Sequence, residues 1–256
     1  MTDRATVLRE LHEAPEILVL ANVWDPASAR AVAAVDGIKA LATASHSIAA
    51  AHGYEDGENI PLDLHLAAVQ RVTAASELPV SMDFEAGYGD PGETTRRAIA
   101  AGAVGANLED QMRPLPEAVA AVEAVVAARE AEGAGFVLNA RTDAFIFARE
   151  PDEGTVAEAV ERGQAFLAAG AECVFVPRLR EPDHIQQLVS ELGPQRLSVI
   201  AAPGVPPAAE LERLGVARVS MGPWSYRVAL TALQDVAAQL LAGGGLPEHV
   251  RADVLP

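Results

Sequence analysis

VSMDFEAGYGDPGETTRRAIAAGAVGANLED, residues 80–110, contains the pattern that decides the fold. An apolar run at 80–84 is followed by a polar loop, by a segment of helical length that ends near Gly102, and by a second apolar run at 105–108. Short apolar runs that alternate with helical segments are typical of parallel strands connected by helices. This stretch therefore predicts one strand, a helix and the next parallel strand.

The same alternation occurs eight times along the 256 residues. Each predicted strand is almost continuously apolar, as expected for a parallel strand that is covered on both faces. The predicted strands are residues 17–23, 38–43, 80–84, 105–108, 136–140, 173–176, 197–201 and 218–221. Eight such units in this length predict an α/β fold, a (β/α)8 TIM barrel that forms a single domain over residues 1–256. An open doubly wound sheet is the alternative, but no G-x-G-x-x-G motif follows the first strand.

Helix boundaries agree with this division of the chain. The pairs that predict helix starts are Asp25-Pro26, Glu181-Pro182 and Pro206-Pro207, and the residues that predict helix ends are Gly102, Gly133 and Gly170. An extra helix is predicted at residues 2–12, before the first strand. A longer helix rich in alanine and leucine is predicted at residues 223–242, after the last strand.

Charge and composition limit the classes of partner. The formal net charge is −17, so nucleic acid and anionic membrane surfaces would be repelled. The first residues contain no apolar signal core, and no apolar run approaches the length of a membrane span, so we expect a cytoplasmic protein. Cys173 is the only cysteine, which excludes an intramolecular disulfide and a thiolate metal cluster. Any metal must therefore be bound by oxygen or imidazole.

Lysine chemistry is also improbable at the expected site. Lys39 is the only lysine, and it precedes the second predicted strand. Active sites of such barrels lie at the C-terminal ends of the strands, so this amine lies at the wrong end to form a Schiff base with a substrate.

Acidic side chains follow several predicted strands. Asp83 and Glu85 are two residues apart on a segment that we expect to be extended, so both should face the same side, and Glu109 follows the neighbouring strand. Asp56 lies in the loop after the second strand. Carboxylates gathered in one concave mouth require a cation or a proton, and oxygen ligands suit Mg²⁺. The alternative is that these acids cap the following helices or stay in solvent.

Other polar residues lie at the same predicted mouth. Arg141 ends an apolar strand beside Asp143, and it either binds a substrate carboxylate or forms an ion pair with the acids. The segment Ser45-His46-Ser47 is either a capped turn or a loop whose amide and hydroxyl groups bind a carboxylate. Trp24 follows the first strand and is expected to form an apolar wall of the pocket.

The chain resembles the isocitrate lyase/phosphoenolpyruvate mutase superfamily from about residue 17 to residue 221. Four segments carry the resemblance: residues 45–57 with GYEDG at 53–57, DFEAGYG at 83–89, GAVGANLED at 102–110 and NARTDAF at 139–145. The resemblance implies that Mg²⁺, or Mn²⁺ in its place, binds at Asp83, with Asp56, Glu85 and Glu109 acting largely through metal-bound waters. It implies further that Ser45 and nearby amides hold the substrate carboxylate, and that the chain is a homotetramer with exchanged C-terminal helices.

The chain departs from the family after the fourth strand. Lyases of the family carry a Lys-Cys-Gly-His type segment there, which includes their catalytic acid, and mutases carry a longer gating loop with Lys and Asn. Here Asp110 is followed by QMRPLP at residues 111–116. Pro177 also stands where several members have His or Glu. These departures argue against isocitrate or methylisocitrate lyase activity and against phosphonate mutase activity.

The shared chemistry of the family leaves one main expectation. We expect a Mg²⁺-dependent lyase or decarboxylase that breaks a carbon–carbon bond next to the carbonyl of a small 2-oxo or 2-hydroxy di-acid, through an enolate. Substrates of the pyruvate, oxaloacetate or 2-oxoglutarate type fit this chemistry. The expected catalytic residues are Asp56, Glu109 and Arg141, and the expected substrate-binding residues are Trp24, Ser45, His46, Ser47, Asp83 and Arg141.

Three alternatives to this function remain open at this point. The first is a phosphonopyruvate-type enzyme acting on a phosphorus–carbon bond, and the second is a non-catalytic binder of a 2-oxo acid. The third is a hydrolase that uses Ser45 with His46, which the adjacency of the two residues disfavours because proton transfer between neighbours rarely has suitable geometry.

Overall fold

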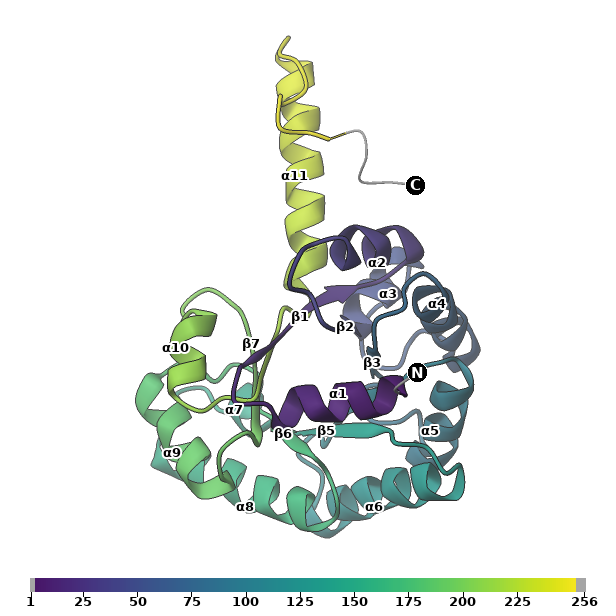
Figure 1. Cartoon of the computed structure of the whole chain (residues 1–256). Helices are drawn as coiled ribbons and strands as arrows, with labels where there is room; N and C mark the ends of the chain where they lie inside the picture. The colour runs from purple at the N-terminus through teal and green to yellow at the C-terminus, as the bar shows by residue number, and fades with distance from the viewer. Residues whose placement is uncertain (1–2, 252–256) are drawn as a thin grey trace.

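The computed structural model of the protein describes residues 3–251 and contains a closed barrel of eight parallel strands (Figure 1). The strands are β1 (Leu18–Val23), β2 (Leu41–Thr43), β3 (Val80–Asp83), β4 (Gly105–Glu109), β5 (Val137–Arg141), β6 (Cys173–Phe175), β7 (Leu197–Ile200) and β8 (Arg218–Ser220). Because β1 pairs with both β2 and β8, the sheet closes on itself. The predicted TIM barrel is confirmed, and the open sheet is excluded.

Helices surround the barrel and connect its strands. They are α1 (Arg4–Glu13), α2 (Pro26–Ala33), α3 (Ser45–Ala51), α4 (Leu62–Ala74), α5 (Pro91–Ala100), α6 (Leu115–Ala131), α7 (Ala144–Phe147), α8 (Glu153–Ala168), α9 (Pro182–Leu192), α10 (Ala208–Arg213) and α11 (Trp224–Leu241). Asp25 caps α2 by accepting a hydrogen bond from Ser28 N at 2.7 Å, with Pro26 in the first turn, as predicted. Thr2, the first residue of the predicted N-terminal helix, lies outside the described residues.

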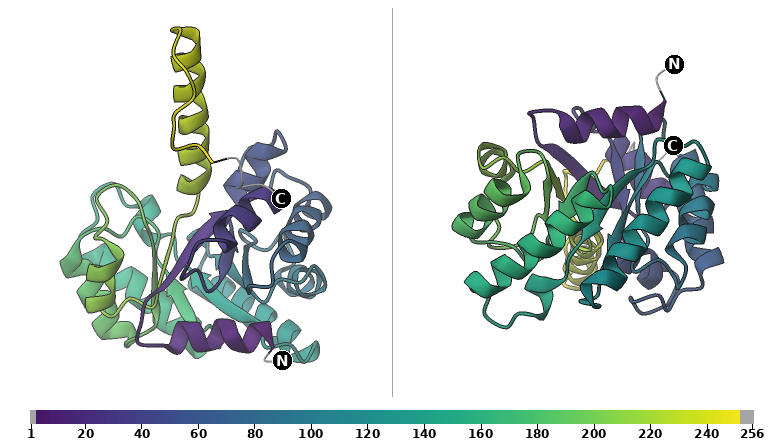
Figure 2. Two further views of the ribbon diagram at one scale, coloured as in Figure 1. Left: turned by 45° about the horizontal axis from the view of Figure 1, so that its top comes forward. Right: turned by 90° about the horizontal axis from the view of Figure 1, so that it is seen from below.

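One end of the barrel is closed by α1 (Figure 2). Leu8 of α1 is fully buried and packs with Leu18 of β1 and Val137 of β5. Lys39 is exposed at this end, before β2, and Cys173 begins β6 in complete burial, so both residues lie where the sequence places them. A ligand must therefore approach from the opposite mouth, at the C-terminal ends of the strands.

The interior of the barrel is partly polar. Asn107 and Glu109 are two residues apart on β4, and Asn139 and Arg141 are their register partners on β5. Asn139 Nδ2 donates to Asn107 Oδ1 at 2.9 Å and lies 3.3 Å from Ser198 Oγ on β7, so these side chains meet inside the barrel. Alternation along a strand then directs Glu109 and Arg141 to the same interior, one layer closer to the mouth.

The last helix, α11, projects away from the barrel (Figure 1). None of its residues is buried, and its exposed apolar side chains include Val228, Leu230, Leu233, Leu240 and Leu241. The long C-terminal helix is confirmed, whereas its exchange between copies stays a prediction. None of the helices in the described part of the chain is long and apolar enough to cross a membrane.

Candidate active site

Two aspartates and a serine form one side of the mouth. Asp83 is the last residue of β3, and its Oδ2 atom accepts from the backbone N–H of Ser45 at 3.3 Å and lies 3.1 Å from Ser45 Oγ. The same hydroxyl lies 3.1 Å from Asp56 Oδ1. A serine hydroxyl has one proton, so it can donate to only one of these carboxylates at a time. Partial desolvation, followed by the negative charge of Asp83, raises the pKa of Asp56.

Glu85 lies differently from the sequence-based prediction. β3 ends at Asp83, and Glu85 has a left-handed backbone with φ of 55°, so the expected extended segment is wrong. The carboxylate of Glu85 is turned to the backbone N–H of Glu58 and to the Tyr88 hydroxyl, the latter at 3.3 Å. Burial, and then the charges of Asp56 and Asp83, raise the pKa of Glu85 to about 8. Glu85 therefore belongs to the same electrostatic cluster as Asp83, but on a different face of the chain.

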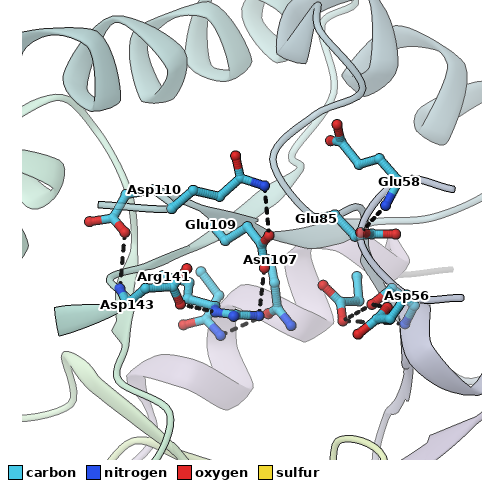
Figure 3. A network of polar contacts seen from close by, with 12 residues as sticks. Asp56, Glu58, Glu85, Asn107, Glu109, Asp110, Arg141 and Asp143 are labelled. Atoms are coloured by element: carbon cyan, nitrogen blue, oxygen red, sulfur yellow. Dashed lines mark hydrogen bonds and ion pairs between the residues drawn. The ribbon is translucent and has the colours of Figure 1, made fainter. Parts of the chain in front are cut away.

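A guanidinium neutralises the other side of the mouth (Figure 3). Arg141 Nη1 lies 2.6 Å from Glu109 Oε2, and Arg141 Nε lies 2.6 Å from Asp143 Oδ1. The sequence left open whether Arg141 pairs with these acids, and the structure shows that it does. Burial raises the pKa of Glu109 to about 7, although the charge of Arg141 opposes this shift. Arg141 Nη2 has no hydrogen-bond partner among the described residues, so this nitrogen stays available to a ligand.

A cavity of about 260 Å³ lies between these two sides. Its polar lining includes Ser45, His46, Asp56, Asp83, Asn107 and Arg141. Its apolar lining includes Ile146, Phe175, Pro177 and Ile200. Glu85 and Glu109 do not line it, and they act on it through their charge and through Arg141. A space of this size is smaller than a typical drug-binding pocket and suits a small organic acid.

The remaining predicted binding residues divide into two groups. His46 lines the cavity, and its buried Nδ1 atom has no partner among residues 3–251. Ser47 is fully buried in α3 and does not line the cavity. Trp24 does not line it either; it borders a neighbouring apolar groove beside α11, where its ring meets that of Tyr226 at 4.9 Å between centroids. The expected role of Trp24 as a wall of the cavity is therefore not what the structure shows.

Ser45 has no hydrogen bond to His46 in the described structure, because its hydroxyl faces Asp56 and Asp83. This arrangement gives no support to the hydrolase alternative, in which the histidine must take the proton from the serine.

The donor set fits a magnesium ion that retains water. Within residues 3–251, no group of three or more His, Cys, Asp or Glu side chains is arranged as a direct ligand set. Mg²⁺ is usually bound by one or two carboxylates with several waters, so such a site needs no larger cluster, and Asp83 as the direct ligand stays a prediction. Asp56 and Asp83 carry oxygen donors only and have no protein cation as a contact partner among the described residues. A divalent cation would relieve the repulsion between these carboxylates.

The loop after β4 is short. Five residues separate Glu109 from Leu115, the first residue of α6, and Gln111 and Met112 both have left-handed backbones. Asp110 is buried in this loop, accepting from Met112 N at 3.0 Å and from the backbone N–H of Asp143 at 2.9 Å. The contacts of Asp110 therefore tie this loop to the segment that follows β5.

Three cavity or near-cavity residues were missed by sequence reasoning. Asn107 lies within a strand predicted as an apolar run, and Arg218 was taken only as the beginning of the last strand. Arg227, at the start of α11, lines the cavity as a second guanidinium. A signal for Asn107 was present, because it lies two residues before Glu109 and a strand places such residues on one face.

Comparisons with known proteins agree with the fold and identify the family. The model of the phosphoenolpyruvate phosphomutase family matches residues 8–241. A crystal structure from Burkholderia cenocepacia J2315, provisionally described as a phosphonomutase, has a TM-score of 0.89 at 40% identity and covers 93% of this chain and 100% of its own. Oxaloacetate decarboxylase from Paraburkholderia xenovorans is 29% identical over 259 residues, which cover 95% of this chain and 84% of that protein. The crystal structure of 2,3-dimethylmalate lyase, a member of the phosphoenolpyruvate mutase/isocitrate lyase superfamily, has a TM-score of 0.84 at 26% identity and covers 98% of this chain and 93% of its own. The chain therefore belongs to the phosphoenolpyruvate phosphomutase family, within the superfamily that its sequence resembles.

Proposed function

We propose that the protein is a divalent-metal-dependent lyase or decarboxylase that breaks a carbon–carbon bond next to the carbonyl of a small 2-oxo or 2-hydroxy di-acid. One observation carries this proposal: Asp83, a carboxylate suited to a metal, and Arg141, a guanidinium suited to an anion, line the same cavity of about 260 Å³. The relatives that are oxaloacetate decarboxylase and 2,3-dimethylmalate lyase support this class of reaction.

Each side of the mouth has its own task in this proposal. Asp83 would hold the metal ion, with Asp56 and Glu85 acting through waters and charge. Mg²⁺ is the expected ion, and Mn²⁺ would serve in its place. When bound, such an ion polarises a carbonyl and stabilises the negative charge that develops as a bond at the neighbouring carbon breaks. Arg141 Nη2 would donate to a carboxylate of the substrate, while Glu109 and Asp143 hold the guanidinium plane in place. The apolar residues Phe175 and Ile200 would exclude water from the opposite wall.

A phosphorus–carbon bond enzyme is the second candidate. The provisional phosphonomutase description of the 40% identical structure favours it, and so does the presence of two guanidiniums, those of Arg141 and Arg227, on the cavity. Against it stands the short loop after β4, which replaces the longer gating loop expected of a mutase. A non-catalytic binder would use the same contacts without turnover.

A substrate screen separates these functions. The protein is incubated with oxaloacetate, 2-oxoglutarate, 2,3-dimethylmalate and phosphonopyruvate in Mg²⁺, and products are followed by NMR. The matched controls are the Asp83→Asn variant in Mg²⁺, which corrects for decarboxylation by free metal, and protein in EDTA, which tests the requirement for the ion. The proposed function predicts cleavage of a carbon–carbon bond in one of the 2-oxo or 2-hydroxy di-acids, and this cleavage should be absent from both controls. Turnover of phosphonopyruvate alone would support the second candidate, and tight binding of these acids without any product would support a binder.

We propose in addition that α11 packs on a second copy of the chain, within a homotetramer. The exposed apolar side chains Val228, Leu233 and Leu241 support this, because a lone helix gains little by exposing them to water. Light scattering tests it directly. The native chain should have the mass of a tetramer, whereas Leu233→Asp should dissociate it. A monomeric native chain at micromolar concentration would contradict this assembly.

A further inference from the structure

The most unusual side chain in the barrel is a buried arginine. Arg218 begins β8 and is 1% exposed, yet it contacts only neutral groups: Nη1 lies 3.3 Å from Ser81 Oγ, and Nη2 lies 3.2 Å from Asn107 Oδ1. Its Nε atom has no partner among the described residues, and it forms no ion pair with any of them. Buried charges in proteins are normally paired, because removing an ion from water is costly. Arg218 is therefore an exception that a purely structural role does not explain.

Arg218 determines which way the amide of Asn107 points. A guanidinium carries only donors, so the Asn107 atom that faces it must be the oxygen. Asn139 Nδ2 donates to the same oxygen at 2.9 Å, so two donors from different strands hold it. The nitrogen of an amide points away from its oxygen. Asn107 Nδ2 is consequently directed away from Arg218, and it has no hydrogen-bond partner within residues 3–251.

Asn107 lines the cavity, and on the neighbouring strand β3 its register partner is Asp83. On the other side, β5 carries Arg141 to the same cavity. Asn107 thus presents a free donor between the carboxylate suited to a metal and the guanidinium suited to an anion. Asn107 keeps 6% of its surface exposed, and its nitrogen is not among the buried atoms that lack a partner, so a ligand in the cavity can accept a hydrogen bond from it.

We propose that Asn107 is a substrate-binding residue whose Nδ2 donates to an oxygen acceptor of the ligand at the inner end of the cavity, and that Arg218 is the positioning residue that fixes this orientation. The inference rests on the proposed function and deepens it. The ligand must present a ketone or carboxylate oxygen toward the barrel interior, and the positive charge of Arg218 beneath it favours an anion. Burial lowers the pKa of Arg218 to about 10, so the guanidinium remains charged at neutral pH. A site built to donate such a bond discriminates strongly against an analogue that lacks the acceptor.

Calorimetric titration of oxalate into the Mg²⁺-loaded protein tests the proposal. Oxalate is a suitable probe because it is small, dianionic and carries acceptors only. Asn107→Asp retains an oxygen toward Arg218 and Asn139 but replaces the donor with an acceptor. It should remain folded and weaken oxalate binding by about a hundred-fold or more. Asn107→Leu, of similar volume, should weaken it by about ten- to hundred-fold without changing Mg²⁺ affinity.

The positioning role of Arg218 needs its own variants. Arg218→Met removes one of the two donors that hold the amide oxygen and should weaken oxalate binding, whereas Arg218→Lys, which also carries only donors, should retain more of the affinity. Ser198→Ala is the matched control: it alters the same polar layer behind Asn139 and should leave oxalate affinity within about two-fold of wild type.

The outcomes separate this inference from the proposed function. Wild-type protein that binds neither oxalate nor any 2-oxo acid would overturn the proposed function and this inference with it. Oxalate affinity that is normal in wild type and unchanged in folded Asn107→Asp would overturn the inference alone. Equal loss in Arg218→Met and Arg218→Lys would remove the positioning role and leave Asn107 as the binding residue.

Discussion

The two sides of the mouth contain the same kind of residue in opposite electrostatic states. On the β4–β5 side, Glu109 and Asp143 each lie 2.6 Å from a nitrogen of Arg141, so protein atoms balance their charge. On the β2–β3 side, Asp56 and Asp83 share one serine hydroxyl, and no described cation contacts them. The difference teaches that strand-end acids alone do not identify a metal site. The acids that the protein leaves without a cation are the ones that require a metal or a proton.

The largest effect should come from the unneutralised side. Asp83→Ala should reduce Mg²⁺ binding below detection by calorimetry and abolish turnover, because it removes the carboxylate that would bind the ion directly. Glu109→Ala should weaken Mg²⁺ binding only by about ten-fold, because Arg141 already neutralises Glu109. Equal Mg²⁺ binding by wild type and Asp83→Ala would refute the assignment of the two sides.

The next effect concerns the neutralised side. Arg141→Lys should remain folded, since a lysine still offers a positive charge to Glu109 and Asp143, but it loses the planar fork and the free Nη2 donor. Binding of a 2-oxo acid should weaken by about ten- to hundred-fold, measured by titration. Unchanged affinity and turnover would make Arg141 a structural counter-ion only, and the loop at residues 45–47 would become the candidate anion site.

A pH experiment sharpens the comparison further. The folded-state pKa of Glu85 is raised to about 8 from its ordinary value of 4.5, so folding favours the protonated carboxyl. The stability that this gives is fully present below pH 4.5 and is lost as the pH rises through about 8. Metal-free protein should therefore be less stable at pH 8.5 than at pH 6.5, because these two values lie on either side of the folded-state pKa of Glu85. Mg²⁺ should raise the melting temperature more at the higher pH, because it offsets the charge that has formed.

Differential scanning fluorimetry at both pH values, with and without Mg²⁺, measures this effect. Glu85→Gln provides the control, because it removes one of the two carboxyls that titrate in this range, the other being Glu109, and should reduce the pH dependence of the Mg²⁺ response. A melting-temperature increase that is the same at both pH values in wild type would contradict the electrostatic coupling between Glu85 and the metal side of the mouth.

The smallest effect is expected far from both sides. Cys173 is fully buried at the beginning of β6, and burial raises the pKa of its thiol to about 12, so it is not a nucleophile at neutral pH. Cys173→Ser should leave turnover within a few-fold of wild type in a steady-state assay. A folded Cys173→Ser variant whose turnover falls by orders of magnitude would contradict the placement of the site at the C-terminal ends of the strands.

Much of this protein could be predicted from its sequence because the relevant signals are local. The apolar period of each strand, the Asp25-Pro26 helix start and the glycines after helices depend on neighbouring residues, and all agree with the structure. The order of the strands then brings Asp56, Asp83, Glu109 and Arg141 to one end, as expected for a barrel. The family, too, follows from motifs that are contiguous in the chain.

Only the tertiary structure decided how the side chains at that end divide their roles. Glu85 turns away because its own backbone is left-handed, two residues after the end of β3. Trp24 packs beside α11, and Arg141 forms ion pairs with two acids from different segments. The orientation of Asn107 depends on Arg218, 111 residues away in the chain. These outcomes depend on register, backbone handedness and donor–acceptor pairing between distant strands, which a one-dimensional pattern of residue types does not encode.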